Sequence, residues 1–382
     1  MNAHSNRATW LAVSAMFILN GALYGIWASR IPAMALRHDL DAAELGLLLL
    51  LLAGGAIAAF PLAGRYADRL GAAFITLRIA VAYTLALALT ALAPNVATLA
   101  MALAVFGATH GAMDVAMNTW AGEAEAHIAR PVMSSFHAMF SLGAGLGAAS
   151  GFAAEHWGVG ILLHLITVGT GVAVLTLGFA RIGWLSPTQD RVRGTPLFPL
   201  PRGPLVLVGL IAFCTSMGEG AMVDWSALLL IETAGVTAAH AALGYSVFSV
   251  AMVITRLLGD QATRVFGPTP TARAAGAIAT LGAVSAVAST SYGITLTGFA
   301  LMGVGYAVIM PLAFSRAARD PHLPPGTAIA SVSTLGYGGL LLGPPLIGFV
   351  AYASTLRTGF ALLAVLAALI IVLAGAVRAD RS

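Results

Sequence analysis

The sequence predicts an all-α membrane protein with twelve transmembrane helices in two six-helix bundles. Three observations lead to this fold class. The 382 residues are 59% hydrophobic and only 9% charged, whereas soluble domains contain about 25% charged residues, so a soluble enzyme is excluded. Apolar runs of about 20 residues, the length that crosses a bilayer, recur along the chain. The second half also repeats the first at a nearly constant offset, which indicates a duplicated bundle.

The first bundle is predicted over residues 1–181, with spans near residues 9–29, 43–63, 74–93, 98–122, 133–154 and 158–180. The first span is long for a signal peptide, lacks a convincing small-residue cleavage site and is followed by eleven more spans, so we expect it to remain as a helix. The second bundle is predicted over residues 205–382, with spans near residues 205–230, 239–258, 271–289, 293–314, 327–349 and 357–378. Residues 182–204, rich in arginine and proline, form the cytoplasmic linker between the bundles.

Arginine alone supplies the 19 basic residues, because the sequence contains no lysine. If both termini are cytoplasmic, sixteen arginines face the cytoplasm and only Arg30, Arg37 and Arg357 face outside. The positive-inside rule therefore predicts this orientation. The arginines do not cluster into one basic face, so nucleic acid is not an expected partner.

The internal repeat is supported by matching residues. Trp27 falls on Trp225 at an offset of 198, and Gly107 falls on Gly303 at an offset of 196. Since each copy has an even number of spans, both insert with the same topology and are related by an axis along the membrane normal. This is the arrangement of two-bundle transporters that rock around a central site.

Residues 64–71, between the second and third spans, read Gly-Arg-Tyr-Ala-Asp-Arg-Leu-Gly, and a related segment after the eighth span runs from Arg256 to Gly267. Asp68 can accept hydrogen bonds from helix-end amides, and Arg69 can pair with an acid. With these residues the sequence resembles the major facilitator superfamily over essentially its whole length, because the family's signature is G-x-x-x-D-R-x-G. The resemblance implies the major facilitator fold, a transporter rather than an enzyme, and a gating role for Gly64, Asp68, Arg69, Gly71, Arg256, Gly259, Asp260 and Gly267.

A narrower resemblance is to the bacterial inner-membrane branch typified by YbjJ, beside the fucose-permease-like sugar:proton symporters. It is carried by residues 27–32, 114–118, 137–143, 218–220 with 224–225, and 336–337 with 343–345. It implies a multi-pass protein of the bacterial inner (cytoplasmic) membrane and says little about the substrate. The first span departs from the fucose-permease pattern, because Asn20 stands where a proton-carrying acid is expected.

Ionisable side chains inside the spans are the first candidates for a substrate or proton site, because each costs about 2.5–3.5 kcal/mol at the membrane centre. Asp114 has His110 one turn before it and Asn118 one turn after it, so the three share one helix face. The functional interpretation is a polar row that faces a cavity. The structural alternative is a carboxylate sealed by His110 or by a neighbouring helix. Glu219 lies between two glycines, which let water or substrate approach it.

Further polar and aromatic residues complete the predicted site. His137 in the fifth span suits proton relay, with a structural histidine as the alternative, and the aromatic residues either frame the cavity or simply pack. The predicted substrate-binding and cavity residues are Asn20, Tyr24, Trp27, Asp114, Asn118, His137, Glu219, Tyr306 and Tyr337. Asp114 and Glu219 are the predicted proton-coupling residues, because desolvation favours a protonated carboxyl group where no cation is near. No ligand spacing typical of a metal motif occurs, so neither a metal nor a cofactor is expected.

The predicted function is secondary active transport of a small organic solute, sugar-like or otherwise neutral and polar, by alternating access with proton coupling. A substrate with a full negative charge is disfavoured, because no arginine is predicted in the middle of a span. The alternatives are a proton-driven efflux antiporter for amphipathic compounds and a non-transporting membrane sensor. The expected partners are the substrate, protons and the lipid bilayer, with the protein acting as a monomer.

Overall fold

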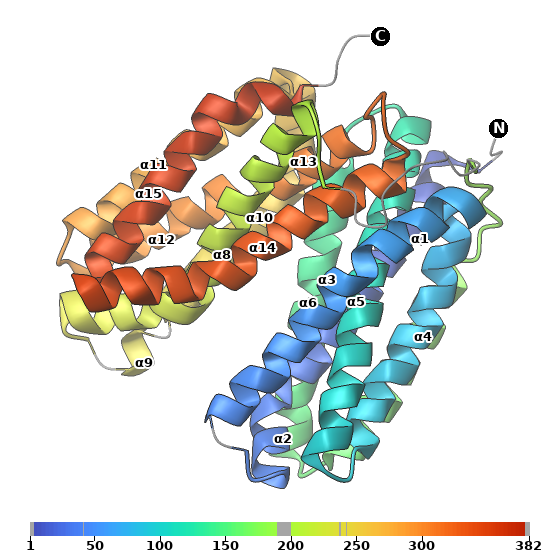
Figure 1. Ribbon diagram of the computed structural model, residues 1–382, viewed down its shortest axis with the longest axis horizontal. Helices are drawn as coiled ribbons and strands as arrows, with labels where there is room; N and C mark the ends of the chain where they lie inside the picture. The colour runs from blue at the N-terminus through green and yellow to red at the C-terminus, as the bar shows by residue number, and fades with distance from the viewer. Residues whose placement is uncertain (1–3, 41, 189–199, 237, 242, 379–382) are drawn as a thin grey trace. The chain divides into compact units, whose positions relative to one another are not determined.

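The computed structural model describes residues 4–40, 42–188, 200–236, 238–241 and 243–378, and these residues contain helices and no strand (Figure 1). The chain divides into two compact units. Unit 1 comprises residues 1–129, 136–199 and 321–330, and unit 2 comprises residues 130–135, 200–320 and 331–382. The predicted bundle limits, 1–181 and 205–382, stay a prediction. They differ from the compact units in the placement of residues 130–135 and 321–330. Part of the predicted linker, residues 189–199, lies outside the described residues.

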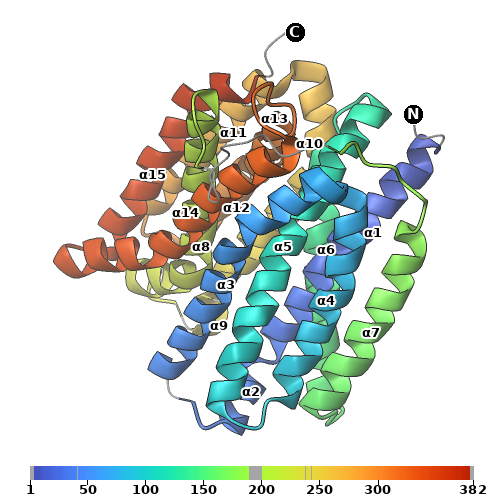
Figure 2. The same cartoon turned by 45° about the vertical axis from the view of Figure 1, so that its right-hand side comes forward.

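Unit 1 is built mostly from long helices, two of which, α1 and α5, begin at a side-chain cap. Its elements are α1 (Asn6–Ser29), α2 (Ile31–Arg37), α3 (Ala42–Leu70), α4 (Ala72–Leu92), α5 (Val96–Ile128), most of α6 (Met133–His156), and α7 (Ile161–Ala180). The Asn95 side chain accepts a hydrogen bond from the Thr98 amide, and the Thr98 hydroxyl accepts one from the Asn95 amide. This capping box starts α5, the longest helix of the chain. Helices α3 and α4 pack on α5, and α1 packs on α7 (Figure 2).

Unit 2 also consists of long helices, but one of its membrane spans is divided into two helices. Its elements are α8 (Pro204–Ala234), α9 (Ala238–Ala241), α10 (Leu243–Phe266), α11 (Pro268–Ala288), α12 (Tyr292–Tyr306), α13 (Ile309–Ala317), most of α14 (Pro325–Ala353), α15 (Leu356–Leu373) and the 3-10 turn η1 (Ala374–Val377). The tenth predicted span thus consists of α12 and α13, which are separated at Ala307 and Val308. Helix α11 packs against both α12 and α15.

Eleven helical segments of the described chain are long and apolar enough to cross a membrane. The remaining predicted span is α6, which is not among these eleven and carries serines, histidines and glycines between its apolar residues. Helix α6 nevertheless packs tightly along α1. A Cβ atom on Gly143 would collide with the Ile18 carbonyl oxygen, and one on Gly147 would collide with that of Ala22. This backbone contact is the role expected of small residues at four-residue spacing in membrane helices.

The internal repeat is visible in how helices cross inside each unit. In unit 1, a Cβ atom on Gly107 of α5 would collide with the Leu52 carbonyl oxygen of α3. In unit 2, a Cβ atom on Gly303 of α12 would collide with the Phe248 carbonyl oxygen of α10. Both members of the second pair lie 196 residues after their counterparts in the first. The two units therefore use the same crossing at the offset predicted from the sequence.

Candidate functional site

A hydrogen-bonded row of polar side chains lies in unit 1 and joins α5 to α6. Asn118 Nδ2 donates to the Asp114 carbonyl oxygen at 2.8 Å and to Asp114 Oδ1 at 3.2 Å. The Asn118 amide oxygen is thereby directed toward His137, whose Nε2 lies 3.2 Å away. Because that oxygen only accepts, His137 carries a proton on Nε2 in this arrangement. Asn118 is fully buried, whereas Asp114 and His137 are half-buried.

A second polar cluster in unit 1 surrounds His110, one turn before Asp114. His110 Nδ1 lies 3.0 Å from Asn20 Oδ1 of α1 and 3.0 Å from the Tyr83 hydroxyl of α4. Asn20 is completely buried, and its Nδ2 contacts Met117 Sδ at 3.6 Å. Tyr83 is not among the predicted site residues. Its signal in the sequence is a tyrosine in the middle of an otherwise apolar span.

Aromatic rings cover both histidines of unit 1. Tyr24 stacks on His110 with ring centroids 5.0 Å apart, and Phe17 meets His137 edge-on at 5.4 Å. Tyr24 is 38% exposed, so it lies at an accessible side of the cluster, whereas Trp27 is 2% exposed and packs against Phe106 in the interior.

Unit 2 contains a buried ion pair that contradicts one expectation from the sequence. The sequence pattern assigns Arg256 to the motif that follows the eighth span, at the very end of the predicted span 239–258, and predicts no arginine in the middle of a span. Arg256 instead lies within α10, and its Nη2 is 3.6 Å from Glu219 Oε2 of α8. The Arg256 side chain is only 9% exposed, and its Nε donates to the Ala307 carbonyl oxygen at 3.3 Å. Glu219 is therefore paired, because helices distant in sequence bring the two charges together.

Tyr306 and Tyr337 also belong to unit 2. Tyr306 is the last residue of α12, is completely buried and packs its ring against Gly218, the neighbour of Glu219. The Tyr306 hydroxyl and Glu219 Oε1 are buried, and neither has a hydrogen-bond partner among the described residues. Tyr337 is half-buried on α14. The Glu219 region thus contains unsatisfied polar atoms, which are unusual in a packed interior.

The predicted gating motif forms a contact inside unit 1, which includes the first turn of α14. Asp68 Oδ1 accepts a hydrogen bond from the Gly326 amide at 2.8 Å, and Asp68 Oδ2 accepts from the Thr327 amide at 2.9 Å and the Thr327 hydroxyl at 2.7 Å. A carboxylate is well placed there, because the first amides of a helix have no partner within it. Arg69 is exposed, and Gly71 has a φ of 95°, which glycine adopts without strain.

The second copy of the motif makes the corresponding contact inside unit 2, at the start of α6. Asp260 Oδ1 accepts from the Ser134 amide at 2.8 Å, and Asp260 Oδ2 accepts from the Ser135 amide at 2.9 Å. The Ser134 hydroxyl donates to the Arg256 carbonyl oxygen at 2.8 Å. A Cβ atom on Gly259 would collide with that hydroxyl, so glycine permits the approach.

Glu123 near the end of α5 forms a contact that the predicted site residues do not include. Its Oε2 accepts from Trp184 Nε1 and from the Ser186 hydroxyl, both at 2.8 Å. Ser186 Oγ in turn accepts from the Ala73 amide at 3.0 Å, at the start of α4. Residues 184–186 are therefore held on unit 1 by hydrogen bonds. A glutamate at the end of a span is typical of a solvated helix end, so the sequence pattern alone does not reveal this contact.

No cluster of three or more potential metal ligands occurs among the described residues. The ionisable side chains of the two regions, Asp114, His110 and His137 in unit 1 and Glu219 in unit 2, are groups that form hydrogen bonds and can bind a proton.

Comparison of the sequence with known proteins identifies the family. The family model of the Major Facilitator Superfamily matches residues 9–322. An uncharacterized transporter, y4wD, of Sinorhizobium fredii is 44% identical over 365 residues, which cover 96% of this chain and 97% of the relative. An uncharacterized MFS-type transporter of Yersinia pestis is 35% identical over 92% of this chain and 91% of its own.

Among solved structures, the major facilitator superfamily transporter FucP, in its outward conformation, is similar in fold. The TM-score is 0.80, and the match covers 97% of this chain and 98% of FucP. Sequence identity is 17%, so this likeness concerns the fold.

Proposed function

The chain belongs to the major facilitator superfamily, and we propose that it carries a small neutral polar solute, such as a sugar-like compound, across the bacterial inner membrane together with protons. The solute is moved by alternating access, as in transporters built from two repeated bundles. The transporting species is a monomer.

The observation that carries this proposal is the pair of hydrogen-bonded clusters in unit 1. Asn20, His110 and Tyr83 form one cluster, and Asp114, Asn118 and His137 form the other. They combine amides, imidazoles and a phenol, which both donate and accept hydrogen bonds and suit a polyhydroxylated solute. The single carboxylate and the absence of a described arginine hydrogen-bonded to it disfavour an anionic solute.

The proposed proton carrier is Asp114. It is a membrane-embedded carboxyl group that accepts a hydrogen bond from Asn118, and the same Asn118 side chain contacts His137 of α6, a second protonatable side chain. Glu219 is the second candidate, but its pairing with Arg256 favours the charged form and opposes proton uptake. The ion pair therefore ranks Asp114 above Glu219.

Uptake into proteoliposomes tests the proposal. A pH-sensitive dye inside the vesicles reports proton movement while monosaccharides, polyols and amphipathic organic cations are added in turn. Protons that enter with a polyhydroxylated solute support symport. Protons that leave as a cation enters, or no proton movement with a transported solute, contradict it and indicate antiport or facilitation.

The variant Asp114→Asn should abolish accumulation driven by a pH gradient while keeping exchange of solute between equal pools, because an amide still forms hydrogen bonds but releases no proton. The matched control is Asp224→Asn, since Asp224 is an exposed carboxylate on α8. Full pH-driven uptake by Asp114→Asn would exclude Asp114 as the carrier and direct the test to Glu219→Gln and His137→Gln.

Asp68 and Asp260 are proposed as gating residues. Each holds two helix-start amides through its carboxylate, at α14 and at α6 respectively. We propose that these contacts form and break during the transport cycle. Asp68→Asn should then change the transport rate with little change in solute affinity at equilibrium. An unchanged rate would exclude a gating role.

Both termini are proposed to be cytoplasmic, from the distribution of arginines. Cys214 is the single cysteine and is buried, so a Cys214→Ser background accepts new labelling sites. A membrane-impermeant maleimide should label His38→Cys in intact cells and Tyr66→Cys only after the cells are opened. Labelling of Tyr66→Cys in intact cells would reverse the orientation.

A further inference from the structure

The tenth span of unit 2 is divided between α12 and α13 at a place that Pro311 explains. In a continuous helix the backbone nitrogen of residue 311 donates to the Ala307 carbonyl oxygen, four residues earlier. Proline has no N–H group and its ring crowds that carbonyl, so a proline inside a helix kinks or breaks it. The helices are separated at Ala307 and Val308. The helical pattern resumes directly afterwards, because the Leu312 amide donates to the Val308 carbonyl oxygen at 3.1 Å.

Arg256 of α10 supplies the hydrogen bond that Pro311 cannot. Its Nε donates to the Ala307 carbonyl oxygen at 3.3 Å, and its Nη2 lies 3.6 Å from Glu219 Oε2 of α8. The guanidinium group is planar, so an acid that holds one of its nitrogens also fixes the direction of the others. Glu219 therefore positions Arg256, and Arg256 holds the carbonyl group that has lost its partner within the helix.

Glycines let α10 and α8 approach the break closely. Gly259 lies one turn after Arg256, and a Cβ atom on it would be 2.7 Å from Val308 Cγ1. Gly218 makes room for the ring of Tyr306, the last residue of α12, because a Cβ atom there would be 2.5 Å from that ring. Two helices of unit 2 thus pack against the break.

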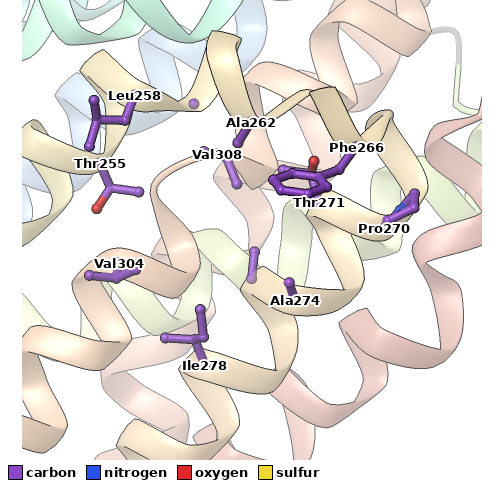
Figure 3. Close-up of a pocket in the computed structure, with 12 residues that line it drawn as sticks. Thr255, Leu258, Ala262, Phe266, Pro270, Thr271, Ala274, Ile278, Val304 and Val308 are labelled. Atoms are coloured by element: carbon purple, nitrogen blue, oxygen red, sulfur yellow. The ribbon is translucent and has the colours of Figure 1, made fainter. Parts of the chain in front are cut away.

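The break also borders an apolar groove of about 370 Å³ between α10, α11 and α12 (Figure 3). Val304, one turn before the break, and Val308, at the break, both line this groove. A side chain enclosed by a close-packed interior cannot shift without strain, whereas one that borders a cavity can. Residues 304–308 therefore have room to move on this side.

Helix α13 is tied to the end of the described chain. Arg316 of α13 donates through Nε to the Arg378 carbonyl oxygen at 3.1 Å, directly after η1. Its Nη1 lies 3.2 Å from Asp320 Oδ2, and these two side chains are only 2% and 3% exposed. Because buried charge pairs are costly to separate, we expect α13 and η1 to move as one body.

We propose that Ala307 and Val308 form a hinge about which α13 and η1 move relative to α12, and that Arg256, positioned by Glu219, holds this hinge in place. Loss of the Arg256 contact frees the Ala307 carbonyl group and lets the angle between the two helices vary. The alternative is a rigid kink, in which packing alone fixes the angle. The hinge lies wholly within unit 2 and requires no particular solute.

Distances between spin labels in the full-length Cys214→Ser protein test the hinge. Ile294→Cys of α12 and Ala318→Cys after α13 carry the labels, about 36 Å apart at 1.5 Å per residue. Arg256→Gln should broaden the distance distribution about twofold, because a released hinge samples several angles. Arg264→Gln is the matched control, since Arg264 is an exposed arginine of the same helix. Equal distributions for the two variants would overturn the hinge.

A second label pair distinguishes a hinge from general loosening. Arg273→Cys and Ala288→Cys both lie on exposed positions of α11, which is continuous. This pair should keep its distribution in Arg256→Gln. Broadening of both pairs to the same extent would overturn the hinge, because it would show that the whole unit has loosened.

Restoring the missing amide tests whether Arg256 acts through the Ala307 carbonyl group. Pro311→Ala supplies an N–H group that donates to this carbonyl in a continuous helix. Arg256→Gln should therefore broaden the distribution much less when Pro311→Ala is also present. Undiminished broadening in the double variant would show that Arg256 acts elsewhere and would overturn the proposal.

Hydrogen exchange provides a measurement that does not depend on folding of Arg256→Gln. Glu219→Ala removes the acid that positions Arg256, so amides of residues 308–315 should exchange about fivefold faster, as expected for the loss of one hydrogen bond. Glu232→Ala is the matched control, because Glu232 is an exposed acid on the same helix. Equal exchange in the two variants would overturn the positioning role of Glu219.

Discussion

Glu219 of α8 and Arg256 of α10 form an ion pair inside unit 2, with 3.6 Å between Oε2 and Nη2. Glu219 Oε1 has no partner among the described residues. Removing the arginine would therefore leave a carboxylate that is largely shielded from water and poorly compensated.

We expect Arg256→Gln to lower the free energy of unfolding by about 2–3 kcal/mol, because an unpaired buried charge costs more than the pair contributes. Glu219→Gln should cost less, since its amide still accepts from Arg256. Thermal unfolding in detergent, followed by the reaction of Cys214 with a fluorogenic maleimide, measures both, because Cys214 is buried in unit 2. The double variant should cost less than the sum of the single variants, and strict additivity would contradict the pairing.

Asn118 is expected to stabilise unit 1 by bridging Asp114 and His137. Asn118→Leu has a similar volume but leaves both neighbours without this partner, so we expect a loss of about 1–3 kcal/mol. Tryptophan fluorescence during thermal unfolding measures the loss. Thr119→Val is the matched control, because Thr119 is a buried neighbour whose hydroxyl donates to the Val115 carbonyl oxygen of its own helix. Equal shifts for the two variants would show that the bridge contributes nothing.

Asp68→Asn should destabilise the protein by about 1–2 kcal/mol, because an amide removes the negative charge and one acceptor at the start of α14. Asp260→Asn should have a similar effect at the start of α6. Arg69→Gln provides the comparison, since Arg69 is an exposed neighbour. The unfolding midpoint in detergent measures all three. A shift for Arg69→Gln as large as that for Asp68→Asn would argue against the helix-start contact.

The glycine crossings predict a fourth effect on stability. Gly107→Ala and Gly303→Ala each place a methyl group against a carbonyl oxygen of the facing helix, and we expect a loss of about 1–3 kcal/mol from overpacking. Gly54→Ala on α3 is the control, because nothing lies within 4 Å of a Cβ atom there. It should be neutral or slightly stabilising, since alanine favours a helix. A neutral Gly303→Ala would mean that the helices separate without cost.

The fold could be predicted in large part from the sequence, because the length of an apolar run determines whether it spans a membrane. The short helix α2 and the separation of α12 from α13 could not, since neither changes the apolar pattern. The offset of the repeat could be predicted because Gly107 and Gly303 must both be small where helices cross.

The sequence predicts the site only for residues that lie on the same helix. The row of His110, Asp114 and Asn118 follows from helical periodicity, as does its direction toward one face. The partners from other helices, Tyr83 for His110 and Arg256 for Glu219, depend on tertiary packing, which spacing along one chain does not encode. The central position of Arg256 in α10 cannot be predicted either, because the helix continues to Phe266, beyond the apolar run that marks the span.

The crossings of Gly107 with Leu52 and of Gly303 with Phe248 identify equivalent positions in the two halves of the chain. They can therefore anchor an alignment of the two halves of a duplicated transporter. Each crossing requires a glycine, which has no side chain, opposite a backbone carbonyl group. Any residue can supply that carbonyl group. Nearly every other position in a duplicated half can therefore drift without disturbing the crossing. An alignment of two halves anchored on these glycines will remain correct after ordinary residue-to-residue similarity between them has been lost.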